Sequence, residues 1–303
     1  MTQHVATRHS WRARLGHSEH VAGWTLVSPA VVLIGVFGLL PVLMSLVLSF
    51  QHSDLLTPET PWVGLENYRK LADDPVFVDA IKHTIIYTAL FVPGTMIVGL
   101  LVAAALNRSV RFISVYRTAA YITMAVSTIS QGIIFLWLTD RDYGLVNAAL
   151  NAAGVSSQPF LASPSQALYV IVAMTIWGWT GFSVIVYLAA LQGVPAELHE
   201  AAAIDGATAS TRFRTITVPL LGPANIFLVV WLTINALQLF DEVYATTRGG
   251  PLRATTVIVY YLWDRAFVQF DAGYAAAMAY VLFVVILVIT AVQFRLARRY
   301  VHT

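Results

Sequence analysis

Cysteine is absent from this 303-residue sequence, and lysine occurs at only two positions, Lys70 and Lys82. Without cysteine the chain forms no disulfide and offers no thiolate to a metal ion. A phosphate-binding P-loop places lysine directly after glycine, whereas Lys70 follows Arg69 and Lys82 follows Ile81. The sequence therefore does not hydrolyse ATP by that route.

Two other kinds of active site are also missing. A zinc-binding helix carries a second His four residues after its His-Glu pair, but the residue four positions after His199 is Ala203. No Gly-x-Ser-x-Gly serine elbow occurs either. We predict no metal site, no catalytic residue and no enzyme activity in the chain by itself.

Charge is scarce as well, and its distribution identifies a membrane protein. Only 11% of the residues are charged, 58% are hydrophobic, and the mean hydropathy is +0.70, values outside the range of soluble domains. Six runs contain no Asp, Glu, Lys, Arg or His, and each meets or approaches the roughly 20 residues that cross a bilayer. They are Trp24–Phe50, Thr84–Leu106, Thr118–Leu138, Ala167–Leu191, Leu221–Phe240 and Gly273–Phe294.

The predicted fold is all-α, a polytopic membrane protein with about six transmembrane helices in one membrane domain, residues 24–294. The first run is longer than the apolar core of a signal peptide, so we interpret it as a retained span. Charge-free spans disfavour proton-coupled transport, because ionisable groups inside a bilayer usually mark proton or ion paths.

Basic residues predict the orientation if the connecting segments alternate sides. One side then holds residues 1–23, 107–117, 192–220 and 295–303, with 11 of the 18 Lys and Arg but four of the 16 acidic residues. The positive-inside rule places this side in the cytoplasm. Both termini, the N-terminal segment 1–23 and the tail 295–303, are therefore predicted to be cytoplasmic.

The segment 192–220 interrupts the apolar pattern with a predicted helix, turn and helix. Pro195 suits a first helical turn, Glu197 and Glu200 favour its positive end, and Gly206 supplies a stop. A second helix is expected to begin at a Ser210 cap and to end where the ring of Pro219 breaks the backbone ladder. On pattern alone, an ordinary solvated loop remains an equal alternative.

Spacing within this segment carries a family resemblance. The segment resembles the EAA loop of permease subunits in binding-protein-dependent ABC importers. The matching pattern is Glu200-Ala201-Ala202, three residues, Gly206, nine residues, Ile216, one residue and Val218-Pro219. Val218 stands where the family usually has Leu. The resemblance implies a type I ABC importer permease fold and a coupling helix that contacts an ATPase subunit, through Glu200, Ala201, Ala202, Asp205, Gly206, Ile216 and Pro219.

The resemblance also implies partners. It predicts a second homologous permease subunit, two ATPase subunits that carry the ATP and Mg²⁺, and an extracytoplasmic solute-binding protein. No cofactor is expected in this chain. Membrane lipid is an expected contact and nucleic acid is not. Sixteen arginines against two lysines suggest a GC-rich bacterial genome, so we expect the bacterial cytoplasmic (inner) membrane.

Two further segments resemble the carbohydrate-uptake subfamily, which includes maltose, trehalose and glycerol-phosphate systems. Residues 64–71 and 74–77 look like the external segment before the second span of the first permease subunit. Residues 241–251 look like the external turn after the fifth span, with departures at 245–247. The resemblance implies a contact with the binding protein at Arg248, Gly249, Gly250 and Pro251, although Gly-Gly-Pro equally fits a tight turn alone.

Amides and aromatic rings within the runs mark a possible solute path. Trp231, Asn235 and Gln238 on the fifth run share one helical face at spacings of four and three. Other candidates are Asn225 on that run, Trp177, Trp179 and Tyr187 on the fourth, and Gln131 on the third. For each, packing or an interface role is an alternative.

The predicted function is ATP-driven import of a sugar, or of a glycerol phosphate or glycerophosphodiester. Such an anionic solute would meet its counter-charge at Arg248 or Arg253, or on the partner permease subunit. The residues leave both solute classes open. The alternative is a neutral-solute channel or membrane scaffold that ATP does not drive. Glycines at 94, 178, 181 and 222 are expected to serve helix packing, and residues 260–267 to form an amphipathic segment at the outer interface.

Overall fold

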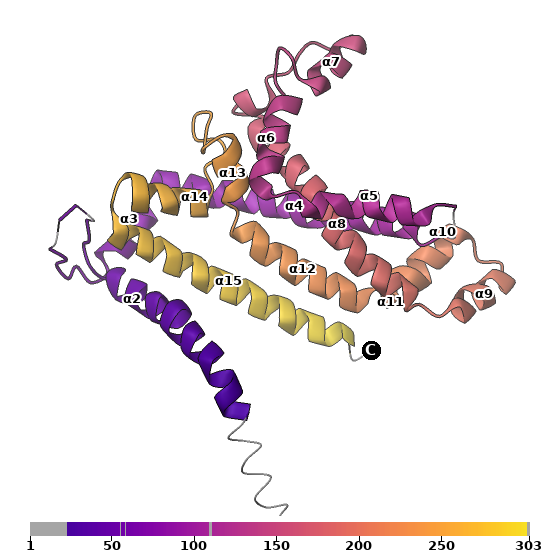
Figure 1. The fold of residues 1–303 in the computed structure, drawn as a ribbon, viewed down its shortest axis with the longest axis horizontal. Coiled ribbons are helices and arrows are strands. Elements are labelled where there is room, and N and C mark those ends of the chain that lie inside the picture. Colours follow the sequence, from indigo (N-terminus) through magenta and orange to yellow (C-terminus); the bar gives the residue numbers. More distant parts are fainter. Residues whose placement is uncertain (1–22, 55, 58, 109–110, 302–303) are drawn as a thin grey trace, which may run out of the picture.

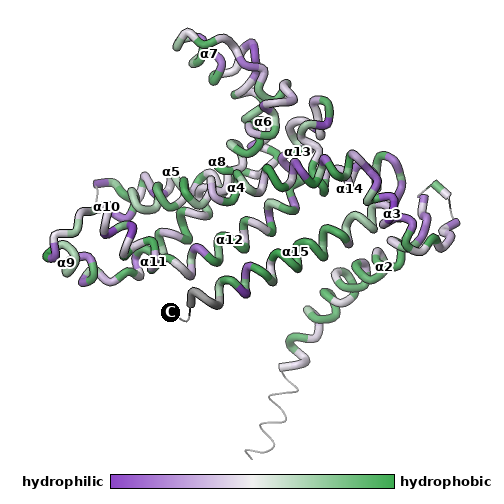
Figure 2. Tube along the Cα trace, turned by 180° about the vertical axis from the view of Figure 1, so that it is seen from behind, coloured by the Kyte–Doolittle hydropathy of each residue, from purple (hydrophilic) through white to green (hydrophobic). Residues whose placement is uncertain are grey.

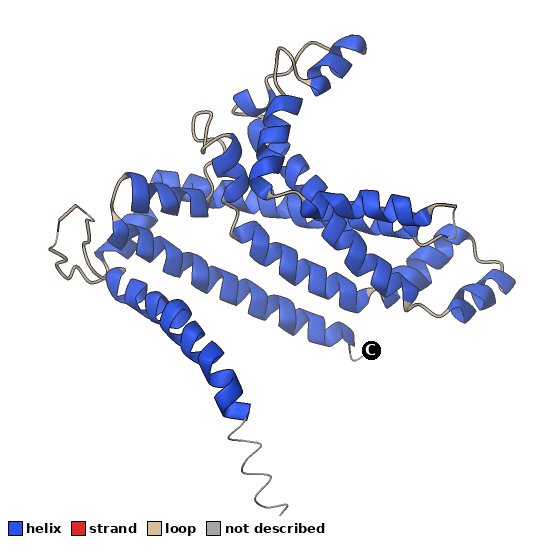
Figure 3. Cartoon of the chain, viewed as in Figure 1, coloured by secondary structure: helices blue, strands red, loops and turns tan. Residues whose placement is uncertain are grey.

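A computed structural model describes residues 23–54, 56–57, 59–108 and 111–301, without the side chains of 298–301. All regular structure in these ranges is helical (Figure 3), and the only β-type pairings there are two isolated bridges. The all-α prediction is confirmed. Most of the predicted segment 1–23 lies outside the described residues.

Four helices in the described chain are long and apolar enough to cross a membrane, or up to six if each of two bent pairs forms one span. The four are Gly23–Leu48, which contains η1 (Ile34–Leu39) and α2 (Leu40–Leu48), then α4 (Pro75–Leu106), α8 (Ala167–Gln192) and α15 (Ala272–Val301). The helices α4, α8 and α15 run through the bundle, whereas the helix that contains α2 diverges from it (Figure 1). Hydrophobic residues predominate on all four (Figure 2).

The bent pairs supply the remaining apolar runs. One pair is α5 (Ile113–Ala125) with α6 (Thr128–Leu138), which meet at 101°. The other joins Ala209–Leu220, made of α10 (Ala209–Arg212), η3 (Phe213–Thr217) and α11 (Val218–Leu220), to α12 (Gly222–Leu237) at 66°. The shorter helices are α3 (Glu66–Asp73), α7 (Leu145–Ala152), η2 (Phe160–Ala162), α9 (Ala196–Ile204), α13 (Asp241–Thr246), α14 (Ile258–Trp263) and η4 (Asp264–Val268).

The third run, predicted as one transmembrane helix, is broken in the structure into α5 and α6, which together can still form one bent span. Val126 has an extended backbone, and the Ser127 hydroxyl then caps α6 by accepting a hydrogen bond from the Ser130 amide at 3.3 Å. A cap of this kind starts a new helix in a new direction. As a result α6 and α7 leave the line of the bundle (Figure 1).

The fifth run also ends differently from the prediction. The helix α12 stops at Leu237, and Gln238 is its C-cap with φ −100° and ψ 15°. The chain then turns into α13. Gln238 therefore ends α12 instead of lying within it, and it lines the same small cavity as Asn235.

Close packing of α4 and α8 forms the centre of the bundle. Their contact buries Tyr87, Phe91, Ile171 and Val184 to 2% exposure or less. Helix association in a bilayer depends on such van der Waals packing, since lipid is as apolar as the side chains. The packing prediction holds for Gly94 and Gly178, where an added Cβ would lie 2.5 Å from Ile176 Cδ1 and 2.1 Å from Gln131 Oε1. It does not hold for Gly222, where an added Cβ would have no neighbour within 4 Å and which lies at the 66° bend before α12.

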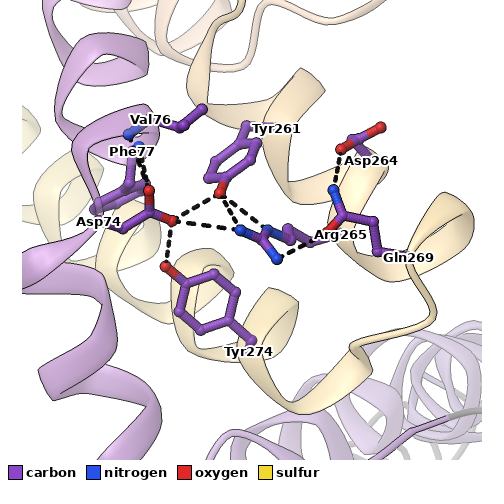
Figure 4. A network of polar contacts seen from close by, with 8 residues as sticks. All are labelled: Asp74, Val76, Phe77, Tyr261, Asp264, Arg265, Gln269 and Tyr274. Atoms are coloured by element: carbon purple, nitrogen blue, oxygen red, sulfur yellow. Dashed lines mark hydrogen bonds and ion pairs between the residues drawn. The ribbon is translucent and has the colours of Figure 1, made fainter.

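A polar network links the start of α4 to α14, η4 and α15 at the end of the bundle that contains α3 and α14 (Figure 4). Asp74 caps α4 by accepting from the amides of Val76 and Phe77, at 2.9 and 3.3 Å. Its Oδ2 accepts from the hydroxyls of Tyr261 on α14 and Tyr274 on α15, both at 2.7 Å. We call Asp74, Tyr261, Arg265 and Tyr274 the Asp74 network.

Arg265 on η4 completes the Asp74 network. Its guanidinium lies 3.8 Å from the Asp74 carboxylate, and its Nε and Nη2 donate to the Tyr261 hydroxyl at 2.9 and 2.6 Å. Burial by itself raises the pKa of Asp74, but the hydrogen bonds from Tyr261, Tyr274, Val76 and Phe77 outweigh it and lower that pKa. Three elements that are distant in sequence are therefore held together by an ionised carboxylate.

Candidate functional site

The segment 192–220 forms the predicted helix, turn and helix at the opposite end of the bundle (Figure 1). The first helix, α9, follows an extended Pro195 and has Glu197 in its first turn. It ends in a Schellman arrangement, in which the amides of Gly206 and Ala207 donate to the carbonyls of Ala203 and Ala202 at 3.1 and 2.9 Å. Gly206 has φ +81°, a conformation that favours glycine.

The second helix departs from the prediction at both ends. Its cap is Thr208, whose hydroxyl accepts from the Thr211 amide at 3.2 Å, and not Ser210. Pro219 does not end it, since the helix continues to Leu220. A proline ring crowds the carbonyl four residues back. Here the turn before it is π-helical, with the Val218 amide bonded to the Phe213 carbonyl, which opens the ladder at that point.

The residues that the family resemblance assigns to coupling lie mostly on the surface of this segment. Glu200, Ala201, Asp205, Gly206 and Pro219 are exposed, while Ala202 and Ile216 are half-buried. Ile204 on α9 is 87% exposed. One side chain links the two helices, as Arg212 Nη1 donates to the His199 carbonyl at 3.1 Å. The segment thus presents a short apolar and acidic helix to whatever lies beyond it.

Two adjoining cavities lie between α4, α5, α6, α8, α12 and α13. The larger, of about 320 Å³, is lined by Met124, Val126, Thr128, Gln131, Gly178, Trp179, Phe182 and Trp231. The smaller, of about 160 Å³, is lined by Tyr87, Phe91, Thr128, Trp179, Asn235, Gln238, Leu239, Phe240, Asp241 and Glu242. Thr128 and Trp179 belong to both, so we treat them as one site and call it the cavity pair.

Four of the five predicted solute-path residues line the cavity pair. Trp231 stacks on Phe182 with ring centroids 6.0 Å apart, and Asn235 and Gln238 line the smaller cavity. Gln131 lines the larger one, but its amide nitrogen donates to the Val126 carbonyl at 2.9 Å. Gln131 therefore also supports the break between α5 and α6.

Of the other residues considered from sequence, Trp179 lines both cavities and the rest lie elsewhere. Trp177 lies outside both cavities and packs on Phe135, with centroids 5.8 Å apart. Tyr187 is buried and its hydroxyl donates to Asn225 Oδ1 at 2.8 Å. This bond between α8 and α12 is a packing contact.

Two carboxylates of the cavity pair were missed from sequence. Asp241 and Glu242 begin α13 directly after the charge-free run. Burial raises the pKa of Glu242 to about 7, and the neighbouring Asp241 adds to the rise. Their position in the first turn after a run that ends in Phe240 was an available signal, since acidic residues favour helix starts.

The segment predicted to contact a solute-binding protein, Arg248 to Pro251, forms a hydrogen-bonded loop after α13. A third cavity of about 330 Å³ there is lined by Arg248, Gly249, Gly250 and Arg253, among others. The hydroxyl of Thr255 donates to the Gly250 carbonyl at 2.7 Å, and that of Thr256 to the Gly249 carbonyl at 3.1 Å. Arg248, Leu252 and Arg253 all have positive φ, from 50° to 63°, which costs non-glycine residues energy.

These features define an all-helical membrane subunit with an open cavity pair lined by aromatic and polar residues, and an exposed helix at one end. Residues 95–302 match the family described as "Binding-protein-dependent transport system inner membrane component". The chain belongs to this family of inner-membrane permease components.

Curated relatives agree with the family. The chain is 36% identical over 293 residues to the lactose transport system permease protein LacF of Rhizobium radiobacter, covering 95% of this chain and 97% of the relative. It is 34% identical to the sulfoquinovosyl glycerol transport system permease protein SmoG of Agrobacterium fabrum, covering 95% and 94%. It is 33% identical to the sn-glycerol-3-phosphate permease protein UgpA of Agrobacterium fabrum, covering 92% and 95%.

Solved structures show the same fold. A chain of a bacterial ABC transporter involved in alginate import matches with a TM-score of 0.84 at 24% identity, over 95% of this chain and 99% of that one. A chain of the alginate transporter in complex with alginate pentasaccharide-bound periplasmic protein matches with a TM-score of 0.83 at 22% identity, over 96% and 98%. The predicted ABC importer permease fold is confirmed.

Proposed function

We propose that this chain is one of two permease subunits of an ATP-driven importer for a sugar, a glycerol phosphate or a glycerophosphodiester. The observation that carries the proposal is α9, a locally capped helix whose exposed Glu200 stands clear of the bundle. Two ATPase subunits hold the ATP and Mg²⁺, and both termini of this chain lie in the cytoplasm with the 192–220 segment.

In this proposal α9 receives the movement of the ATPase pair. A narrow helix, with Ala at 201–203, fits deep into a groove of a partner. Arg212 ties α9 to the second helix of the segment, and that helix leads into α12. Closure of the ATPase pair on ATP then displaces α12, which contributes Trp231 and Asn235 to the cavity pair.

The cavity pair serves as the solute site. Aromatic faces stack on sugar rings, and amides or carboxylates hydrogen-bond their hydroxyls. At the other end, the loop with Arg248, Gly249, Gly250 and Pro251 contacts a solute-binding protein that delivers the solute. The exposed tip of that loop, with Leu252 at 88% exposure, supports a contact with another protein.

The test is solute-stimulated ATP hydrolysis and uptake by the complete complex in proteoliposomes, with its binding protein. The variant Glu200→Ala with Gly206→Pro removes the exposed acid and distorts the end of α9. We expect roughly tenfold lower uptake and loss of solute-stimulated ATPase activity. The matched control is Asp142→Ala, which removes an exposed carboxylate between α6 and α7 and leaves both activities unchanged.

If uptake is the same with and without ATP and is unchanged in the Glu200 variant, the result supports the second candidate, a neutral-solute channel or scaffold. The charge-free apolar runs favour passage of neutral solutes in that case. Copurification of an ATPase subunit with this chain separates the two functions, since a channel needs none.

A further inference from the structure

The charge of the cavity pair differs from that of the outer cavity. Among the described residues that line the cavity pair, none is Lys, Arg or His, and two are acidic, Asp241 and Glu242. The outer cavity is lined by Arg248 and Arg253 with a single acid, Asp264, and shares no lining residue with the pair. An anion in the cavity pair therefore meets two carboxyl groups and no basic side chain among the described residues of this chain.

Several polar side chains in the smaller cavity are available to hydrogen-bond a solute. Within the described chain, the side chains of Gln238 and Asp241 have no hydrogen-bond partner in another residue. Asn235 donates its Nδ2 to the Trp231 carbonyl at 2.8 Å and keeps its Oδ1 as an acceptor. The Asp241 carboxylate and the amide oxygens of Asn235 and Gln238 are thus available as acceptors, which match the O–H donors of a polyhydroxylated solute.

Aromatic rings provide the other half of a sugar site. Tyr87 and Phe91 stack with centroids 5.3 Å apart, and the Trp179 ring meets Phe91 edge-on at 6.2 Å. These three rings line the same small cavity as Gln238 and the carboxylates. An apolar wall beside convergent polar groups is the usual form of a small-molecule site.

We infer that the cavity pair selects a neutral polyhydroxylated solute, a sugar or polyol, and rejects phosphate esters and uronates. A buried anion without a partner is strongly disfavoured, and like charges disfavour it further. The inference rests on the proposed function, because it assumes that the transported solute passes through the cavity pair. It separates two solute classes that the relatives' names leave open.

The experiment uses the absence of cysteine. Gln238→Cys places the first thiol in this chain, at the wall of the smaller cavity, and Thr128→Cys is a second reporter at the junction of the two cavities. The complete complex is labelled with N-ethylmaleimide, a neutral reagent, and incorporation into this chain is followed on gels. Labelling rates are compared with and without lactose, maltose, sn-glycerol 3-phosphate or galacturonate.

We expect at least one of the two sugars to slow labelling several-fold at concentrations where the two anions have no effect. Asp241→Asn with Glu242→Gln should then reduce the discrimination between sugar and anion by about tenfold. The matched control is Asp264→Asn, which removes a carboxylate from the outer cavity only and should leave the discrimination unchanged.

Two outcomes overturn the inference. One is protection by sn-glycerol 3-phosphate that equals or exceeds protection by the sugars. The other is the absence of protection by any solute while uptake stays dependent on Glu200, which leaves the proposed function standing. Conversely, selective sugar protection with uptake that is independent of ATP overturns the proposed function and supports the solute class.

Discussion

The two ends of the bundle are built in opposite ways. At the end with α3 and α14, one carboxylate joins α4, α14 and α15, and Tyr261 and Tyr274 are 97% buried. At the other end, α9 is shaped by contacts within its own segment, namely its Schellman turn and the bond from Arg212. The difference indicates that the first end holds its shape alone, whereas the second has surface left for a partner.

The largest expected effect comes from removing the shared carboxylate. Asp74→Ala deletes the α4 cap and leaves two tyrosine hydroxyls and Arg265 without their acceptor. We expect a loss of roughly 2–4 kcal/mol in the free energy of unfolding. Thermal unfolding of the purified protein in detergent measures it as a lower Tm.

Asp73→Ala is the matched control for this change, since Asp73 is the exposed neighbouring residue at the end of α3. An equal Tm for the two variants would contradict the role given to the Asp74 network.

A smaller and local effect is expected in the 192–220 segment. Thr208→Ala removes the observed cap of the second helix and should cost about 1 kcal/mol. Because few contacts link this segment to the bundle, the loss appears as faster amide hydrogen exchange at 209–217, with little change in Tm.

Ser210→Ala provides the comparison, because sequence alone predicts Ser210 as the cap and the structure assigns Thr208. Equal exchange rates in both variants, or a larger effect at Ser210, would contradict the observed cap.

The smallest expected effect concerns pH. Because the folded pKa of Asp74 lies below its ordinary value of 3.8, the stability it contributes is complete above that value. This stability is lost only as pH falls through the lowered folded pKa. The Tm difference between the unmodified chain and Asp74→Asn should therefore stay constant from about pH 8 to about pH 5. A difference that changes within that range would mean that another group titrates with the network.

Sequence predicts the helices well because charge-free length and helix signals are local properties. The runs, the turn at Gly206 and the face shared by Trp231 and Asn235 all follow from spacing. The break at Val126 and Ser127 was missed, since both residues are compatible with an apolar span until the serine hydroxyl finds its amide.

Contacts between distant residues could not be predicted in this way. Asp74 meets Tyr261 and Tyr274 across 187 and 200 positions, and no single-sequence pattern pairs them. Asp241 and Glu242 were missed as cavity residues for another reason, because the charge-free criterion ends the fifth run at Phe240 and leaves both acids in the predicted external turn, residues 241–251.

The π-helical turn at Phe213–Thr217 determines how the residues that follow it are rotated about the helix axis. A single residue inserted into or deleted from an α-helix rotates everything beyond it by about 100°. Removing one residue here would leave the hydropathy and the apolar run unchanged. The side chains of α11 and of the first turn of α12 would nevertheless be rotated about the helix axis relative to the bundle. The length of this short turn is therefore constrained more tightly than its composition, and variation in length is better tolerated between α6 and α8, where the chain lies away from the bundle (Figure 1).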